Sequence, residues 1–287
     1  MDYQEPHTAS DNKRRYILGD LAGDLTAAAV SATLVAPTVT IIDRSLVESA
    51  SSNRPLLNSL RQNAQAALKH PGRFALSSPF GIVWALYAAT YTVANGTETI
   101  AKEFHPSMVE SITFSSTFLV NVPLGVWKDI RFAQKFSNRP IAATNTATNA
   151  AKAALRSSSK IASRAATATF LLRDGVTIFG SFTLAPHCTE LVPDSMASFP
   201  HSKTIISQII VPVLSQLVAT PLHLLGLDLY NQHGASWSSR MAMIRANLPS
   251  ATAMRCVRII PAFGFGCLAN MGLRSLFHGV NMDSPLD

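Results

Sequence analysis

The chain has 287 residues, of which 47% are hydrophobic and only 14% are charged. Because soluble domains average about 25% charged residues, this composition argues against an ordinary soluble enzyme and favours a membrane protein or an unusually large core. The net charge of +7 would suit binding to nucleic acid or to anionic lipid, and it would equally suit the charge bias that sets membrane topology.

The three cysteines are Cys188, Cys256 and Cys267. No two of them have the spacing of a metal or redox motif, and an odd number does not fit a disulfide framework. The sequence also shows no phosphate-binding loop and no Ser/His/Asp set. We therefore expect no metal, no cofactor and no catalytic residues, so the chain is not predicted to be an enzyme.

The N-terminal segment has no targeting pattern that we recognise. No apolar core follows a basic start, as it would in a secretory signal peptide. The same segment carries several acidic residues, which are rare in mitochondrial presequences. We expect any targeting information to be internal.

Six long stretches of the chain are nearly free of charge. A membrane-spanning helix needs about 20 residues, with a lower limit of about 17, and proline or glycine is tolerated where neighbouring helices satisfy the backbone. No stretch shows the alternation of a β-strand, so we predict an all-α protein. The stretches are residues 25–42, 74–97, 111–127, 165–189, 204–227 and 259–273.

The segments between these stretches alternate in charge. Residues 43–73, 128–164 and 228–258 together hold 17 Lys/Arg and 4 Asp/Glu, whereas the remaining segments hold 6 and 12. A soluble bundle gives no reason for this sorting, but six spans that obey the positive-inside rule do. Both termini would then lie on the acidic side. The positive charge is thereby explained, and we expect no nucleic-acid partner.

The longest basic segment, residues 139–164, contains no acidic residue. Four of its five cations fall at intervals of four, which places them along one side of a helix. The segment is either a surface that binds anionic lipid, cardiolipin included, or a solvated linker rich in Ser, Thr and Asn. The four cations are Lys152, Arg156, Lys160 and Arg164.

A charged pair, Arg173 and Asp174, lies inside the fourth apolar stretch. Ionisable residues are costly within a membrane span and mark functional sites by default. Arg173 could bind a carboxylate and Asp174 an ammonium group. Alternatively, the two residues pair with each other or with Arg258, or Arg173 marks a helix end. His223, in the fifth stretch, is either a proton-titratable group or an interhelical hydrogen-bond donor.

Three prolines, Pro37, Pro123 and Pro221, lie late in the odd-numbered stretches, 86 and 98 residues apart. Each is followed by an acid six or seven residues later and by Glu or Gln eleven residues later. This recurrence indicates an internal repeat of two spans. The residues that follow the prolines are Asp43 and Glu48, Asp129 and Gln134, and Asp228 and Gln232.

Three span pairs with a proline ending each odd span resemble the mitochondrial carrier family. The stretch RIIPAF at residues 258–263 is similar to the last helix of that family. The resemblance implies six transmembrane helices in three pseudo-repeats around a central cavity, with short surface helices on the basic side. The implied parts are a tail (1–17), repeats of about 18–104, 105–195 and 196–278, and a second tail (279–287).

The family places an acid two residues and a base five residues after each proline, and these charges close a gate. Here the acid positions hold Val39, Gly125 and His223, and among the base positions only Lys128 is basic. The resemblance assigns substrate binding to Arg173, Asp174 and Arg258. It assigns helix kinking and the gate to Pro37, Asp43, Pro123, Lys128, Asp129, Gln134, Pro221, Asp228 and Gln232.

The implied function is carrier-like, alternating-access transport of a small solute, an amino acid or a carboxylate, across the mitochondrial inner membrane. The displaced gate acids favour an alternative, a carrier-derived scaffold without transport activity that serves membrane fusion, protein insertion or assembly. The outer membrane and the peroxisome are the alternative locations. The expected partners are the solute and membrane lipid, and the sequence does not set the oligomeric state.

Overall fold

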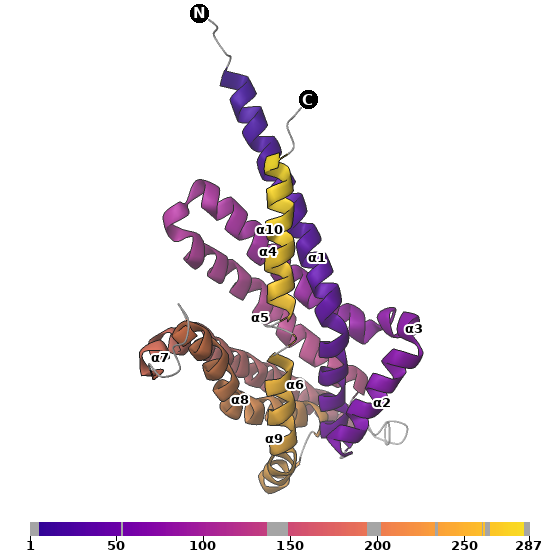
Figure 1. Ribbon diagram of the computed structural model, residues 1–287. Coiled ribbons are helices and arrows are strands. Elements are labelled where there is room, and N and C mark those ends of the chain that lie inside the picture. Colours follow the sequence, from indigo (N-terminus) through magenta and orange to yellow (C-terminus); the bar gives the residue numbers. More distant parts are fainter. Residues whose placement is uncertain are drawn as a thin grey trace, which may run out of the picture. The chain divides into compact units, whose positions relative to one another are not determined.

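The described residues of the computed structural model form helices and no strand, so the predicted all-α class is confirmed for this part of the chain (Figure 1). Long apolar stretches without the alternation of a β-strand explain this outcome. The structure describes residues 6–52, 54–136, 149–193, 202–232, 235–259, 261 and 265–283.

The three odd-numbered stretches lie in the long helices α1 (Pro6–Ser52), α5 (Val109–Phe136) and α8 (Ser202–Asn231). We expected each proline to end its span, and this expectation is wrong. Each of the three prolines lies inside its helix, which continues for several turns. A proline removes one backbone hydrogen bond, but apolar surroundings keep the remaining bonds of the helix together.

The returning helices are less regular. The second stretch lies mostly in α4 (Ser78–Phe104). The fourth begins in α6 (Asn149–Ile178), continues as a π-helical turn (Phe179–Leu184) and ends in α7 (Ala185–Cys188). The sixth expected stretch begins at the end of α9 (Trp237–Ile259) and continues in α10 (Gly266–Asp283), and residues 260 and 262–264 between these helices lie outside the described residues.

Three helical segments in the described part of the chain are long and apolar enough to cross a bilayer: Arg15–Ser51, Pro106–Phe136 and Ile210–Asn231. They contain the first and third stretches and most of the fifth. The protein is therefore a helical membrane protein. The six-span count and the three repeats stay predictions.

The chain divides into two compact units, each built from separate segments. Unit 1 comprises Met1–Thr40, His70–Gly125 and Ile260–Asp287. Unit 2 comprises Ile41–Lys69 and Val126–Ile259.

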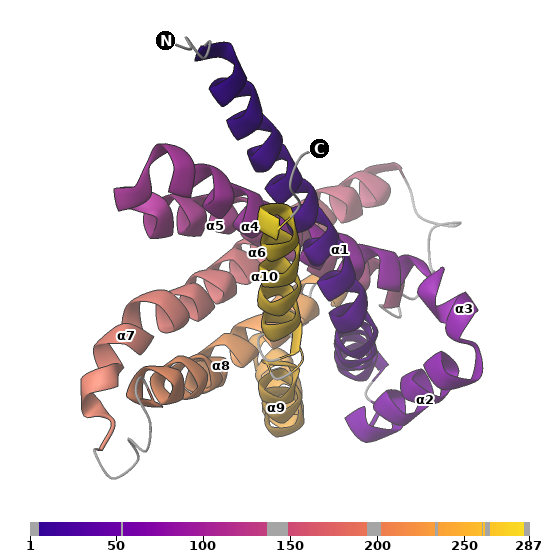
Figure 2. The ribbon, with the colours of Figure 1, turned by 45° about the horizontal axis from the view of Figure 1, so that its top comes forward.

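Unit 1 places α10 beside α1 and α4, as both ribbon views show (Figures 1 and 2). Polar groups hold these helices together. The amides of Asn95 (α4) and Asn270 (α10) exchange two hydrogen bonds of 2.9 and 2.8 Å. Buried Asp24 (α1) accepts hydrogen bonds from Arg274 Nε at 2.7 Å and from Thr99 Oγ1 at 2.5 Å. Such interhelical bonds are typical of helices packed in lipid.

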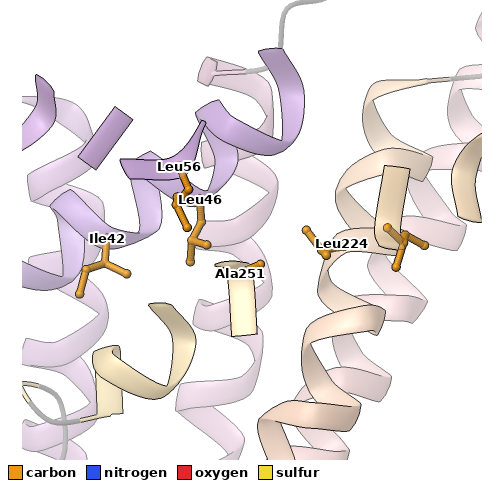
Figure 3. Close-up of a cluster of buried hydrophobic side chains, with 6 residues drawn as sticks. Ile42, Leu46, Leu56, Leu224 and Ala251 are labelled. Atoms are coloured by element: carbon orange, nitrogen blue, oxygen red, sulfur yellow. The ribbon is translucent and has the colours of Figure 1, made fainter. Parts of the chain in front are cut away.

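Unit 2 packs α6 against α8 and α8 against α9. Its hydrophobic core draws on the end of α1, on α2 (Leu56–Lys69), on α8 and on α9, and Figure 3 draws the core side chains of these helices as sticks. Gly226 of α8 allows a close approach of α6, since a Cβ there would lie 2.5 Å from the ring of Phe170. The core residues are Ile42, Leu46, Leu56, Leu224, Ile244 and Ala251.

Short helices occur in the basic segment 43–73, where we expected surface helices. In α2 the buried residues Leu56, Ser59 and Asn63 recur at helical spacing, so one side faces unit 2. A second short helix, α3 (Pro71–Ala75), belongs to unit 1. In the basic segment 139–164, α6 begins at Asn149. The side chains of Lys152, Arg156 and Lys160 lie outside the described residues, so the lipid-binding surface stays a prediction.

Candidate substrate and gate site

The predicted site residues meet in unit 2. Lys128 of α5 is buried and forms two ion pairs, one with Asp43 of α1 at 2.5 Å and one with Asp129 at 2.8 Å. Asp43 lies 85 residues before Lys128 in the sequence. The acid of the first predicted repeat thus bonds the base of the second, although neither Asp43 nor Asp129 has the spacing from proline that the carrier family uses.

Arg173 of α6 is buried and fully engaged by protein groups. Its guanidinium pairs with Asp129 and, at 2.5 Å from Nη2 to Oδ1, with Asp174. It also lies over the ring of Phe170, 5.4 Å from the ring centre. The structure displays the pairing of Arg173 with Asp174, which is one of the alternatives that the sequence left open. Arg173 is not a helix-end residue, since α6 continues to Ile178.

His223 of α8 also contacts this arginine. Arg173 Nη1 lies 2.9 Å from Nδ1 of the imidazole. A guanidinium can only donate hydrogen bonds, so the ring nitrogen accepts. His223 therefore makes the interhelical bond that the sequence suggested, but as the acceptor rather than the donor.

Arg258 of α9 joins the same assembly through Asp43, with 3.2 Å between Nε and Oδ1. Arg173 and Arg258 are thus each ion-paired with a predicted gate residue, and Asp174 joins them through Arg173. We call this assembly the buried charge network. Its members are Asp43, Lys128, Asp129, Arg173, Asp174 and Arg258.

The remaining predicted gate residues lie elsewhere. Asp228 of α8 is buried and pairs with Arg240 of α9, which also donates to the carbonyl oxygen of Gln232 at 2.7 Å. The side chains of Gln134 and Gln232 are exposed, and Gln134 bonds Arg131 on its own helix. No side-chain hydrogen bond or ion pair joins these residues to the network in the described part of the chain. Pro37 lies in unit 1, and Pro123 and Pro221 lie inside their helices.

Two polar residues beside the network were not predicted from the sequence. Arg255 of α9 is only 7% exposed, and its Nε donates to Oε1 of Gln216 in α8 at 3.1 Å. Arg255 lies in a segment that we counted as a basic loop, so nothing in the sequence pattern indicated that this arginine is buried. Gln216 is a polar residue within the apolar fifth stretch, and that contrast could have marked it.

The network leaves one acceptor unused. Oδ2 of Asp174 is buried and has no hydrogen-bond partner among the described residues. A buried carboxylate oxygen without a partner is costly, and such an atom is suited to accept a bond from a cationic ligand.

A family model described as "Probable citrulline exporter" matches residues 27–278. The chain belongs to this family. The match covers both units and every residue of the buried charge network. A search among curated proteins found no match.

Membership of the probable citrulline exporter family, together with the three apolar helices, identifies a membrane protein that transports a small solute. The match is not to the mitochondrial carrier family, so the resemblance drawn from the sequence is not confirmed, and nothing in the match conflicts with a divergent carrier. The mitochondrial location and the carrier mechanism stay proposals.

Proposed function

We propose that this protein exports citrulline, or a similar neutral amino acid, across the mitochondrial inner membrane by carrier-like alternating access. The observation that carries the proposal is the buried charge network in a chain of the probable citrulline exporter family. Buried charges inside apolar helices are retained in transporters because they bind polar solutes or close the path behind them.

The proposed substrate matches the chemistry of the network. A neutral amino acid carries one carboxylate and one ammonium group, which call for a cation and an acid side by side. Asp174 has an unused buried oxygen for the ammonium. Arg173 holds the other oxygen of Asp174 and so fixes the direction of the free one. Arg258, which contacts Asp43, completes the predicted substrate set.

The pair between Asp43 and Lys128 is proposed to act as a gate. It joins α1 to α5, and both side chains are buried. Breaking a buried pair without replacement costs about 3–5 kcal/mol. The protein can open this pair only when other interactions offset the cost, and substrate binding would supply them. The opening of the Asp43–Lys128 pair would then be coupled to substrate binding.

The transport proposal is tested by reconstitution into liposomes. Vesicles loaded with unlabelled citrulline should take up labelled citrulline, and uptake of ornithine and glutamate should be slower. The substitution Asp174→Asn preserves size and removes the charge, and uptake should fall by about tenfold or more, as expected for the loss of a charge-assisted bond.

Arg245→Gln is the matched control for expression, because Arg245 is exposed on α9. It should leave citrulline uptake unchanged. Wild-type uptake no greater than that of protein-free vesicles, or equal uptake by wild type and Asp174→Asn, would remove the proposal. Fractionation of mitochondria tests the inner-membrane assignment.

A scaffold without transport activity is the second candidate. One observation favours it: Arg173 and Arg258 are each paired with a carboxylate of the protein itself. In that case the network serves only stability. A well-folded protein that takes up none of the amino acids, and whose network substitutions alter only thermal stability, would favour the scaffold.

A further inference from the structure

Arg255 differs from the other buried cations of unit 2. Buried Lys128, Arg173 and Arg240 each form an ion pair with an aspartate, and so does the half-buried Arg258. Arg255 is 7% exposed, yet its hydrogen bond goes to a neutral amide, and no carboxylate pairs with it within the described residues. A buried charge without a counterion is strongly disfavoured. Its retention calls for a ligand that supplies the missing negative charge.

Gln216 holds the guanidinium in place. Its Nε2 donates to the carbonyl oxygen of Pro212 at 3.2 Å, so the amide oxygen is turned toward Arg255. Both partners of Gln216 lie in unit 2, and α8 packs against α9 there. The bond uses one of the five donors of the guanidinium. The N–H groups on the two terminal nitrogens are then left to a ligand, in the planar fork that matches a carboxylate.

The charges around Arg255 cannot neutralise it. Arg173 and Arg258 repel it, while Asp129 and Asp43 attract it. Both aspartates are already shared by two other cations. The network and Arg255 together contain three carboxylates and four cations, leaving His223 aside. One positive charge is therefore uncompensated within the described residues.

We infer that Arg255, held by Gln216, binds the carboxylate of the transported amino acid. Arg255 has only a neutral amide partner and Asp174 has an unused oxygen, so the two residues fit the two opposite charges of one amino acid. A phosphate monoester carries about two negative charges and no cation. The inference rests on the proposed function, to which it adds the carboxylate anchor, and Asp174 stays the proposed anchor of the ammonium. Arg173, which the sequence offered for the carboxylate, then positions Asp174 instead.

The sharpest test is Gln216→Glu, which gives Arg255 a carboxylate partner within the protein. The detergent-purified variant should melt at a higher temperature than wild type without ligand, because the buried charge is now paired. Citrulline should stabilise wild type against heating but not the variant. A misfolded variant could not produce higher stability, so the result is interpretable. Full retention of citrulline-induced stabilisation by Gln216→Glu would overturn the inference.

A second test removes the carboxylate from the ligand. Citrulline amide lacks the negative charge, and wild type should bind it about 10- to 100-fold more weakly than citrulline, as the loss of a charge-assisted bond predicts. Arg255→Gln should bind the two compounds equally. Arg255→Lys, which keeps the charge without the fork, should discriminate between them less than wild type does. Two control variants should keep the wild-type ratio of affinities for citrulline and citrulline amide. They are Arg240→Gln, which removes another buried arginine of α9, and Arg245→Gln.

The two proposals fail differently. Loss of binding by Arg255→Gln to both compounds in the same proportion would show a structural role and overturn the inference. If citrulline binds through Arg255 but wild-type vesicles show no uptake, the carboxylate site stands and the transport function falls. If vesicles transport citrulline and Arg255→Gln keeps the wild-type ratio, the function stands and the inference falls.

Discussion

Asp129 is the residue on which most of the buried charge network depends. It accepts ion pairs from Lys128 at 2.8 Å and from Arg173, and all three side chains are buried. Buried pairs add little net stability compared with an apolar core, but removing one partner leaves the other charge without compensation. Asp129 compensates two charges at once.

We therefore predict that Asp129→Asn is among the most destabilising isosteric substitutions in the chain. The free energy of unfolding in mixed detergent micelles should fall by about 3–5 kcal/mol. The control is Lys102→Gln, which breaks an exposed pair with Glu98 one turn away and should cost less than about 1 kcal/mol. Equal losses for the two variants would mean that the network is solvated rather than buried.

At this scale the sequence was informative where charge stood out against apolar neighbours. Arg173 and Asp174 interrupt a long apolar stretch, and this contrast marked them as site residues. Their actual partners could not be predicted, because Asp129 lies in a segment counted as a loop and its burial depends on how far α5 extends. Arg255 was missed for the same reason, since its helix α9 lies in a basic segment.

The helices of unit 2 approach one another through a glycine. Gly226 of α8 faces the ring of Phe170 in α6, and both residues belong to the contact between these two helices. Small residues at such contacts let helices pack closely in membranes. Added volume has nowhere to go here, because the nearby atoms belong to a rigid aromatic ring.

Gly226→Ala should therefore destabilise the protein by about 1–3 kcal/mol through overpacking. Gly175→Ala in α6 is the matched control, because a Cβ at Gly175 meets no atom within 4 Å. That change should be neutral or stabilise by up to about 1 kcal/mol, since alanine favours helix over glycine. Thermal unfolding of both variants in detergent measures the difference. A neutral Gly226→Ala would show that α6 and α8 are farther apart than described.

The elements themselves could be predicted in type but not in extent. The length of the apolar stretches predicted the positions of the long helices, because a long continuous apolar stretch indicates a helix whatever its packing partners are. Their ends could not be predicted, since α1, α5 and α8 continue through Pro37, Pro123 and Pro221 into charged sequence that becomes buried in unit 2.

For the whole molecule, the charge sorting of the segments predicts the topology. With an even number of spans, both termini lie on one side of the membrane and the three basic segments on the other. Three spans meet the length and hydropathy needed in the described part, so the number of crossings is the open structural prediction. The repeat boundaries and the central cavity stay predictions.

Cysteine labelling measures this topology. In a background with Cys188, Cys256 and Cys267 replaced by serine, single cysteines at Ser10 or Ser284 should react with an impermeant maleimide from one side of sealed vesicles. Cysteines at Ser137 or Ser238, in two basic segments, should react only from the other side. Labelling of Ser284→Cys and Ser137→Cys from the same side would contradict the six-span topology.

The hydrogen bond between Asp24 and Arg274 connects residues 250 positions apart. Asp24 therefore leaves the ribosome 250 residues before Arg274. Until Arg274 has been synthesised, the carboxylate lacks this counterion and must stay hydrated or protonated, because an unpaired charge in lipid is costly. Unit 1 can therefore mature only after α10 has been made. A nascent chain cut short before α10 would retain an uncompensated acid, a defect that surveillance proteases can recognise.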